Sequence, residues 1–183
     1  TIYIFDCSYA TKSMERIENG ENCIAFAASD NALNYYPSLP CDIFTSCLLT
    51  PAKVSLLRQA QKYKDNNVGL LSEIEIQTMI DLINDSPEAI NILENALEAI
   101  ADRIAFLSLS DDQDLFFKLF RSDIITSKFF YNFLFAQRAL KAISMEPKSF
   151  PPLPDTSNHP LWNLFDLHID RALYSLKESL KPS

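Results

Sequence analysis

The chain opens with Thr1-Ile2-Tyr3-Ile4-Phe5-Asp6-Cys7-Ser8-Tyr9, and this stretch decides its fold class. Residues 2 to 5 are apolar, β-branched or aromatic, a composition that predicts a buried strand. Asp6, Cys7 and Ser8 then follow at the carboxyl end of that strand, at the mouth of the sheet. A buried strand needs a neighbour on each edge. We therefore expect a preceding part of the sheet to lie outside this chain, which would make the chain a fragment or a strongly reduced homologue.

Two further segments have strand character. Residues 23 to 28 are apolar and small, which suits tight packing, and residues 43 to 48 (Ile-Phe-Thr-Ser-Cys-Leu) give a third candidate. The polar interval from 9 to 21 predicts a loop with a short helix, and the two prolines between 34 and 40 predict a connection. The beginning of the chain is therefore expected to form a sheet of about three strands.

Helical signals dominate after residue 50. Thr50-Pro51 and Ser86-Pro87 each place a capping hydroxyl before a proline at the first helical position. Ser110 and Gln113 have the spacing of a capping box. Apolar residues then recur at helical spacing. The predicted helices cover about 51–63, 76–83, 87 to beyond 104, 115–120 and 124–143, with a last one that begins at Pro160. The fold class is therefore α/β with a helix-rich second part.

The last two predicted helices differ in how they should be covered. In the 124–143 helix, Tyr131 and Phe135 lie off the main apolar stripe, so we expect more than one side of it to be buried. That stripe consists of Phe129, Phe130, Phe133 and Leu134. Residues 146 to 155 contain four prolines and predict an extended linker. The final helix has an apolar stripe of Leu161, Phe165, Ile169, Leu173, Leu176 and Leu180. Such a stripe needs a partner, so we expect the isolated chain to fold poorly.

The net charge of −8 is concentrated in one interval. Residues 71 to 115 carry 11 acidic side chains and a single basic one, Arg103. An acidic interval repels phosphate backbones, which argues against nucleic-acid binding. It is interpreted as a solvated helical face, with a docking surface for a basic partner as the alternative.

The remaining composition argues against cofactors and metals. With only 2 glycines, the chain lacks the glycine-rich phosphate loops that bind nucleotides. Its 4 cysteines, Cys7, Cys23, Cys41 and Cys47, have no CxxC spacing, so we expect buried free thiols in a reducing cytoplasm. The aromatic and apolar run from 129 to 136 is far shorter than the roughly 20 residues of a spanning helix, so we expect no membrane-spanning segment.

Cys7 is the sharpest candidate for chemistry. Caspase-like enzymes hold their nucleophilic cysteine at the mouth of a strand, and they need a histidine to help generate the thiolate and a donor for the oxyanion. The caspase signature Gln-Ala-Cys-x-Gly is replaced here by Phe5-Asp6-Cys7-Ser8-Tyr9. The catalytic histidine would fall before Thr1. We therefore interpret Cys7 as an inactive thiol at the nucleophile position and predict no catalytic, cofactor-binding or metal-binding residues.

The other candidates are weaker by spacing. Asp166 and Asp170 flank His168 at i±2 and point away from it on a helix, so they do not form a metal site with it. His159 precedes Pro160 and is interpreted as a helix-entry residue. Trp162 is interpreted as a core residue, with a partner hot spot as the alternative.

Several ordered blocks resemble the Raptor family of regulatory proteins associated with the target-of-rapamycin (TOR) kinase. These blocks are 3–8, 22–28, 39–51 (Leu-Pro-Cys-Asp-Ile-Phe-Thr-Ser-Cys-Leu-Leu-Thr-Pro), 115–123 (Leu-Phe-Phe-Lys-Leu-Phe-Arg-Ser-Asp), 130–138 and 159–167. Between two of the blocks, the acidic interval 71–98 replaces a stretch that is usually basic in the family. The docking of short substrate motifs, associated with that neighbourhood in the family, is therefore in doubt for this chain.

The resemblance implies a partial caspase-like α/β fold followed by a solenoid. Residues 1–145 would be the C-terminal part of the caspase-like domain, 146–157 a proline-rich linker, and 158–183 the start of an armadillo-like helical solenoid. It also implies a non-catalytic, cytoplasmic scaffold that binds TOR kinase and its substrates, with peripheral recruitment to the lysosome or vacuole through partners. The alternative is a caspase-like cysteine peptidase, or a degenerate relative, that uses Cys7.

Overall fold

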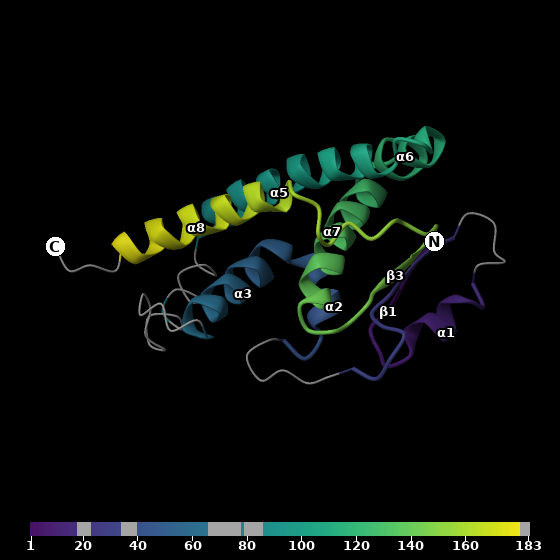
Figure 1. The fold of residues 1–183 in the computed structure, drawn as a ribbon, viewed down its shortest axis with the longest axis horizontal. Coiled ribbons are helices and arrows are strands. Elements are labelled where there is room, and N and C mark those ends of the chain that lie inside the picture. The colour runs from purple at the N-terminus through teal and green to yellow at the C-terminus, as the bar shows by residue number, and fades with distance from the viewer. Residues whose placement is uncertain (18–22, 34–39, 66–77, 79–85, 180–183) are drawn as a thin grey trace.

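The chain folds as a three-stranded sheet covered by helices, in a computed structural model that describes residues 1–17, 23–33, 40–65, 78 and 86–179 (Figure 1). The described residues form seven helices and three strands, which confirms the α/β class. The predicted 76–83 helix and nearly all of the 34–40 connection lie outside the described residues, as does the acidic interval before residue 86, apart from Thr78.

The sheet is mixed and has the order β1-β2-β3. Strands β1 (Ile2–Phe5) and β2 (Ile24–Ala27) lie where the sequence predicts them, and they pair in parallel, with Ile2 opposite Ile24. Their connection contains helix α1 (Ala10–Met14). Two buried residues of this helix, Ala10 and Met14, pack on one face of the sheet. The other face of β2 is turned toward the long helices (Figure 1).

The third strand is not the one that the sequence predicts. Strand β3 (Lys148–Phe150) comes from the proline-rich interval and pairs antiparallel with β2, so that Ala25 lies opposite Phe150. The prolines flank this short strand at 147 and 151, where they remove no ladder hydrogen bond from its interior. Part of the interval expected to be a linker is therefore built into the sheet edge.

Residues 43 to 48, predicted as a strand, form helix α2 (Ile43–Leu49) instead. The strand prediction rested on β-branched and aromatic residues. However, the four buried residues also have helical spacing, and they face α7. They are Ile43, Phe44, Cys47 and Leu48. Packing on one side of the segment therefore outweighs its local β preference.

The remaining helices begin close to the positions that their capping signals indicate. They are α3 (Pro51–Asp65), α5 (Pro87–Ser108), α6 (Gln113–Phe120), α7 (Ile124–Lys141) and α8 (Trp162–Ser179). Two details differ. The cap of α6 is Asp112, whose carboxylate accepts the Leu115 N–H at 3.0 Å, and not Ser110. Ile92, although apolar and next to the buried Leu93, is 59% exposed on α5. None of the described helices is both long enough and apolar enough to cross a bilayer.

Helix α7 lies at the centre of the core. As expected, it is buried on several sides: ten consecutive or nearly consecutive residues between Phe130 and Leu140 are inaccessible to solvent. Phe133 lies with its ring centre 5.2 Å from that of Phe26 on β2 and 6.5 Å from that of Phe44 on α2. Phe130 and Phe120 connect the same cluster to α6, with ring centres 5.8 Å apart. One helix thus joins the sheet to the helical layer.

Helix α8 finds partners within the chain for the first half of its apolar stripe. Phe165, Ile169 and Leu173 are buried in the same core cluster as α5 and α7. Figure 1 shows α8 lying beside α5, and α3 also contacts it. The expectation of an entirely unpartnered stripe is therefore wrong for these residues. The side chains of Leu176 and Leu180 lie outside the described ones.

We predict that Phe133→Ala destabilises the protein by about 3–5 kcal/mol, because it leaves a cavity between the sheet, α2 and α7. Phe117→Ala removes a side chain of the same size that is 58% exposed and should cost less than about 1 kcal/mol. Pulse proteolysis in urea measures both changes. Equal losses for the two variants would contradict this account of the core.

Candidate functional site

At the C-terminal end of β1, polar side chains accept hydrogen bonds from backbone N–H groups of neighbouring segments. One carboxylate oxygen of Asp6 accepts the Thr45 N–H at 2.9 Å and the Thr45 hydroxyl at 2.7 Å. Thr45 lies in the first turn of α2, where backbone N–H groups have no partner within the helix. Asp42, the residue just before α2, makes no side-chain cap. Asp6 therefore caps α2 from the end of a strand, and its negative charge suits the helix N-terminus.

Tyr9, which stands where the caspase signature has glycine, has a left-handed backbone conformation. Its φ and ψ angles are 56° and 32°, in the left-handed region that costs a residue with a Cβ atom of order 1 kcal/mol. The Tyr9 N–H donates to the Asn31 carbonyl at 3.0 Å, and the Ser8 hydroxyl accepts the Leu33 N–H at 3.0 Å. These bonds compensate the strain. The Tyr9 N–H is therefore already used in a bond to the loop after β2.

Cys7 lies exposed at this strand mouth. Within the described residues, no hydrogen bond joins it to a histidine. His159 lies in the turn before α8, where Nδ1 accepts the Leu161 N–H at 3.2 Å. This bond agrees with its interpretation as a helix-entry residue. His168 lies further along α8. The described residues therefore provide an accessible thiol with no histidine bonded to it.

Cys47 is the opposite kind of thiol. It is fully buried on α2, and this burial raises its pKa to about 12 although the nearby Arg58 acts in the other direction. At neutral pH Cys47 is therefore protonated and packs as a small apolar side chain. Cys41 is exposed, like Cys7, so the expectation of buried thiols is wrong for these two and holds for Cys47.

The acidic face of α5 is occupied by cations of this same chain. Lys128 on α7 lies 3.3 Å from Glu94 and 3.6 Å from Glu98. Asp102 receives two guanidinium hydrogen bonds from Arg121, at 2.6 and 2.9 Å, and one from the Tyr131 hydroxyl at 2.8 Å. Burial, together with the bond to Asp102, raises the pKa of Tyr131 to about 12, which keeps it a donor. These contacts favour a structural role for this row of acids.

The described residues contain no cluster of three or more histidine, cysteine, aspartate or glutamate side chains that could hold a metal ion. The carboxylates at helical spacing on α5 point to Lys128 and Arg121 and do not converge on one another.

A second polar constellation fixes α8 to α7. Arg138 donates to both carboxylate oxygens of Asp166, at 2.8 and 2.7 Å, in a bidentate pair that is about one quarter exposed. The Arg138 guanidinium also lies over the Trp162 ring, 5.6 Å from its centre. Trp162 is buried and donates its indole N–H to the Thr156 carbonyl at 2.8 Å. These contacts support its interpretation as a core residue.

The turn before α8 is tied to α7 as well. The Gln137 side-chain oxygen accepts from the N–H and hydroxyl of Thr156, at 3.3 and 3.0 Å, while its amide nitrogen donates to the Pro154 carbonyl at 3.2 Å. Gln137 is buried, so these bonds are shielded from water. We call the contacts of Gln137, Arg138, Thr156, Trp162 and Asp166 the α7–α8 joint. The joint fixes the angle between α8 and α7.

Sequence reasoning did not identify this joint. Arg138 and Asp166 are separated by 28 residues, and neither stands in a local motif that indicates a partner. The one available signal was that both lie within blocks that resemble the Raptor family, 130–138 and 159–167.

Comparisons with known proteins agree on one family, although no family model matches the chain. The chain is 32% identical to "Regulatory-associated protein of TOR 1" of Arabidopsis thaliana over 97% of its own length and 14% of that protein. It is 35% identical to "Target of rapamycin complex 1 subunit mip1" of Schizosaccharomyces pombe, over 87% of the chain and 12% of that protein. The crystal structure of Chaetomium thermophilum Raptor matches all of the chain and 18% of its own, with 34% identity and a TM-score of 0.76.

The chain is a homologue of one segment of the Raptor proteins. The agreement of sequence and fold along nearly the whole chain confirms the resemblance stated from the ordered blocks. The chain spans about one seventh or less of the length of these curated relatives. The match therefore concerns a Raptor segment, and the relatives carry many residues that have no counterpart here.

We predict that a thiol-directed electrophile labels Cys7 and Cys41 in the native protein but labels Cys47 only after unfolding. Cys47 is shielded from the reagent, and its raised pKa suppresses the reactive thiolate. Mass spectrometry of peptides labelled with and without denaturant measures this difference. Native labelling of Cys47 at the rate of Cys41 would show that the burial of α2 is wrong.

We also predict that Asp166→Asn loosens α8 by about 1–3 kcal/mol, because it removes the charge that faces a partly buried arginine. Amide hydrogen exchange in α8 should accelerate by about tenfold or more. Glu94→Gln removes the same charge from an exposed pair and should change the local stability by less than about 0.5 kcal/mol. The account of the joint fails if the two substitutions have the same effect on α8.

Proposed function

We propose that this chain is part of a non-catalytic scaffold subunit of a TOR kinase complex. The observation that carries the proposal is the agreement with proteins whose names state this association: one is a regulatory-associated protein of TOR and another a target of rapamycin complex 1 subunit. Because the chain corresponds to only a small share of these proteins, their partners are transferred here as a proposal.

The proposed mechanism is binding and positioning. A platform that holds the kinase and a substrate together raises the effective concentration of the substrate at the kinase active site. Such a platform has to be rigid, and two features of this chain support rigidity. Helix α7 is shared between the sheet and the helical layer, and the α7–α8 joint ties the last helix to it with a bidentate ion pair.

In this proposal, residues 1–145 are the C-terminal part of a caspase-like domain, 146–157 a linker and 158–183 the start of an armadillo-like solenoid. The parallel β1-β2 pair with its helical crossover supports the first assignment. Strand β3 and the buried residues of α8 imply that the linker and the start of the solenoid share one core with the platform. The protein would act in the cytoplasm and reach the lysosome or vacuole through its partners.

The proposal includes the absence of peptidase chemistry at Cys7. Three observations support this: Asp6 caps α2, Ser8 and Tyr9 hydrogen-bond to a neighbouring loop, and no described histidine is bonded to Cys7. Substrate docking in the manner of the family is a separate question. On α5, Glu94 and Glu98 pair with Lys128 and Asp102 pairs with Arg121, whereas Glu88 is exposed, so this face is acidic where the family is usually basic.

We expect the affinity-tagged protein to co-purify with a TOR kinase from cells that contain the complex, and Cys7→Ser to recover the same amount. A scaffold needs the shape of the strand mouth but not the thiol. Quantitative mass spectrometry of the recovered proteins, together with a peptide-cleavage assay, measures both properties. Absence of the kinase, or a cleavage activity that disappears in Cys7→Ser, would overturn the proposal; Cys41→Ser serves as the control for an exposed thiol.

A further inference from the structure

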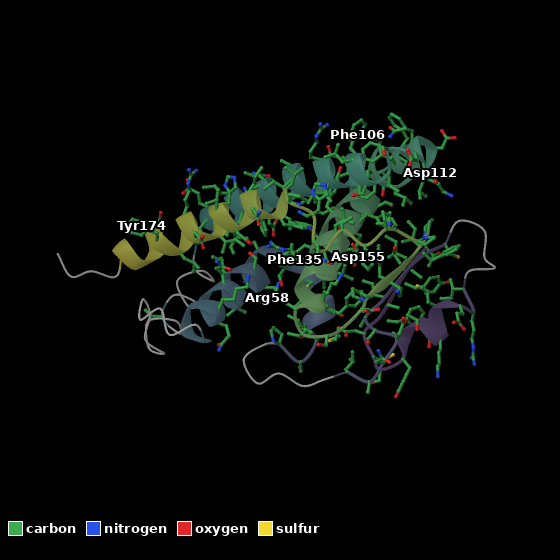
Figure 2. The ribbon with its side chains drawn as sticks, in the orientation of Figure 1. Arg58, Phe106, Asp112, Phe135, Asp155 and Tyr174 are labelled. Carbon is green, nitrogen blue, oxygen red and sulfur yellow. The ribbon has the colours of Figure 1, made fainter. Side chains whose placement is uncertain are left out.

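A cavity of about 430 Å³ lies between α3, α7, α8 and the turn before α8. Its walls include Arg58 and Lys62 from α3, Arg138 and Lys141 from α7, and Ser157 and His159 from the turn. Figure 2 shows Arg58 at α3, on the side toward Phe135 and the base of α8. The volume lies within the range of about 300–1,000 Å³ that is usual for small-molecule sites.

The charges around this cavity do not balance. Four of its lining residues are permanent cations, and Asp166 is the one acid among them. Both oxygens of Asp166 are engaged by Arg138, and Lys141 is paired with Asp155 outside the lining. Asp170, which also faces Lys62, accepts a hydrogen bond from Gln59 at 2.8 Å. Arg58 and Lys62 remain, and within the described residues neither of them forms an ion pair.

Arg58 is the most informative of these groups. A guanidinium has five N–H donors and no acceptor, yet the described part of the chain offers Arg58 no hydrogen bond. Its burial lowers its pKa, and the neighbouring charge of Arg138 acts in the same direction. Arg58 is only partly exposed, and an arginine partly removed from water without an acid beside it is in an unfavourable state that an anion would relieve. Its donors therefore face a space that an anion would fill.

Ser157 provides an independent indication. Its hydroxyl is buried, the residue is 6% exposed, and it lines the same cavity. The hydroxyl lies near the Asp155 carboxylate but makes no hydrogen bond of ordinary geometry, the one such side-chain atom among the described residues. Unpaired buried polar atoms are rare and commonly mark the place of an ion or ligand. His159 adds a further donor, because Nδ1 is already an acceptor and leaves the proton on Nε2.

We propose that this cavity binds the phosphate group of a small phosphorylated ligand, with Arg58 as its principal contact and Lys62, Ser157 and His159 as further donors. A phosphate matches these groups better than a carboxylate does, because it presents three oxygens and a charge of about −1.5 to −2 to two unpaired cations. Arg138 and Lys141 contribute positive potential, although acids already occupy their donors. This proposed binding activity is additional to the scaffold function and does not depend on it.

Isothermal titration calorimetry of the full chain with pyrophosphate at constant ionic strength tests the proposal. Arg58→Gln should weaken binding by about tenfold or more, since a hydrogen bond to a charged group contributes about 1.5–3 kcal/mol. Arg103→Gln removes an exposed arginine whose guanidinium lies over the Phe106 ring on α5, outside the cavity, and should leave the affinity unchanged. Equal weakening by the two variants would reduce the binding to general charge attraction and overturn the site.

Thermal unfolding without ligand separates binding from folding. Arg58→Gln should unfold at the same temperature as the unmodified protein or above it, because it removes a charge that has no partner. A large loss of thermal stability in Arg58→Gln would assign Arg58 a structural role and contradict the proposal. Citrate that binds as tightly as pyrophosphate would also contradict it, because citrate carries carboxylates and no phosphate. Vesicles that contain a phosphoinositide distinguish the source of the phosphate: binding that Arg58→Gln abolishes supports the site with a lipid headgroup as ligand. Binding of a phosphopeptide alone would overturn the small-ligand assignment.

Discussion

The structure depends on the burial of α7 on nearly every side. A helix that is covered by a sheet on one side and by α2, α3, α5 and α6 elsewhere cannot shift without disturbing all of them, because protein interiors are close-packed. Phe133 and Phe130 make the contact with Phe26 on the sheet. Asn132, one position away, uses its buried amide to bind the Leu48 carbonyl at 2.7 Å. The same helix turn therefore positions both the sheet and the end of α2.

The limits of sequence reasoning follow from this central position. The strands β1 and β2 and the starts of α3 and α5 were predictable, since their signals are local: apolar runs, and a proline after a hydroxyl. Helix α2 was not. Its two ends are satisfied by Asp6, 39 residues before Thr45, and by Asn132, 84 residues after Leu48. Neither partner is visible in a short window, so the β-branched and aromatic composition of the segment predicted a strand.

The polar groups at the C-terminal end of β1 hydrogen-bond to α2 and to the loop after β2, and so stabilise the fold. Tyr9 keeps a left-handed turn that glycine would adopt more easily, and a hydrogen bond to Asn31 holds it there. Asp6, next to Cys7, is an N-cap for α2. The sequence located the end of this strand correctly, but the thiols were expected to be buried and Cys7 is exposed. The sequence could not reveal that the neighbouring groups are bonded to α2 and to the loop after β2, because those bonds join distant segments.

Arg138 and Arg58, which both line the cavity beside α8, differ in whether a described acid pairs with them. Arg138 has a bidentate acid, an aromatic ring and a place in the α7–α8 joint, so its charge is compensated within the chain. Arg58 lies across the same cavity, where burial lowers its pKa and the charge of Arg138 acts in the same direction, and no acid among the described residues forms an ion pair with it. A leucine at that position would pack against α7 at lower cost, so folding alone does not explain an arginine there. The proposed anion site would give a physical reason for this guanidinium, which has no ion pair within the described residues.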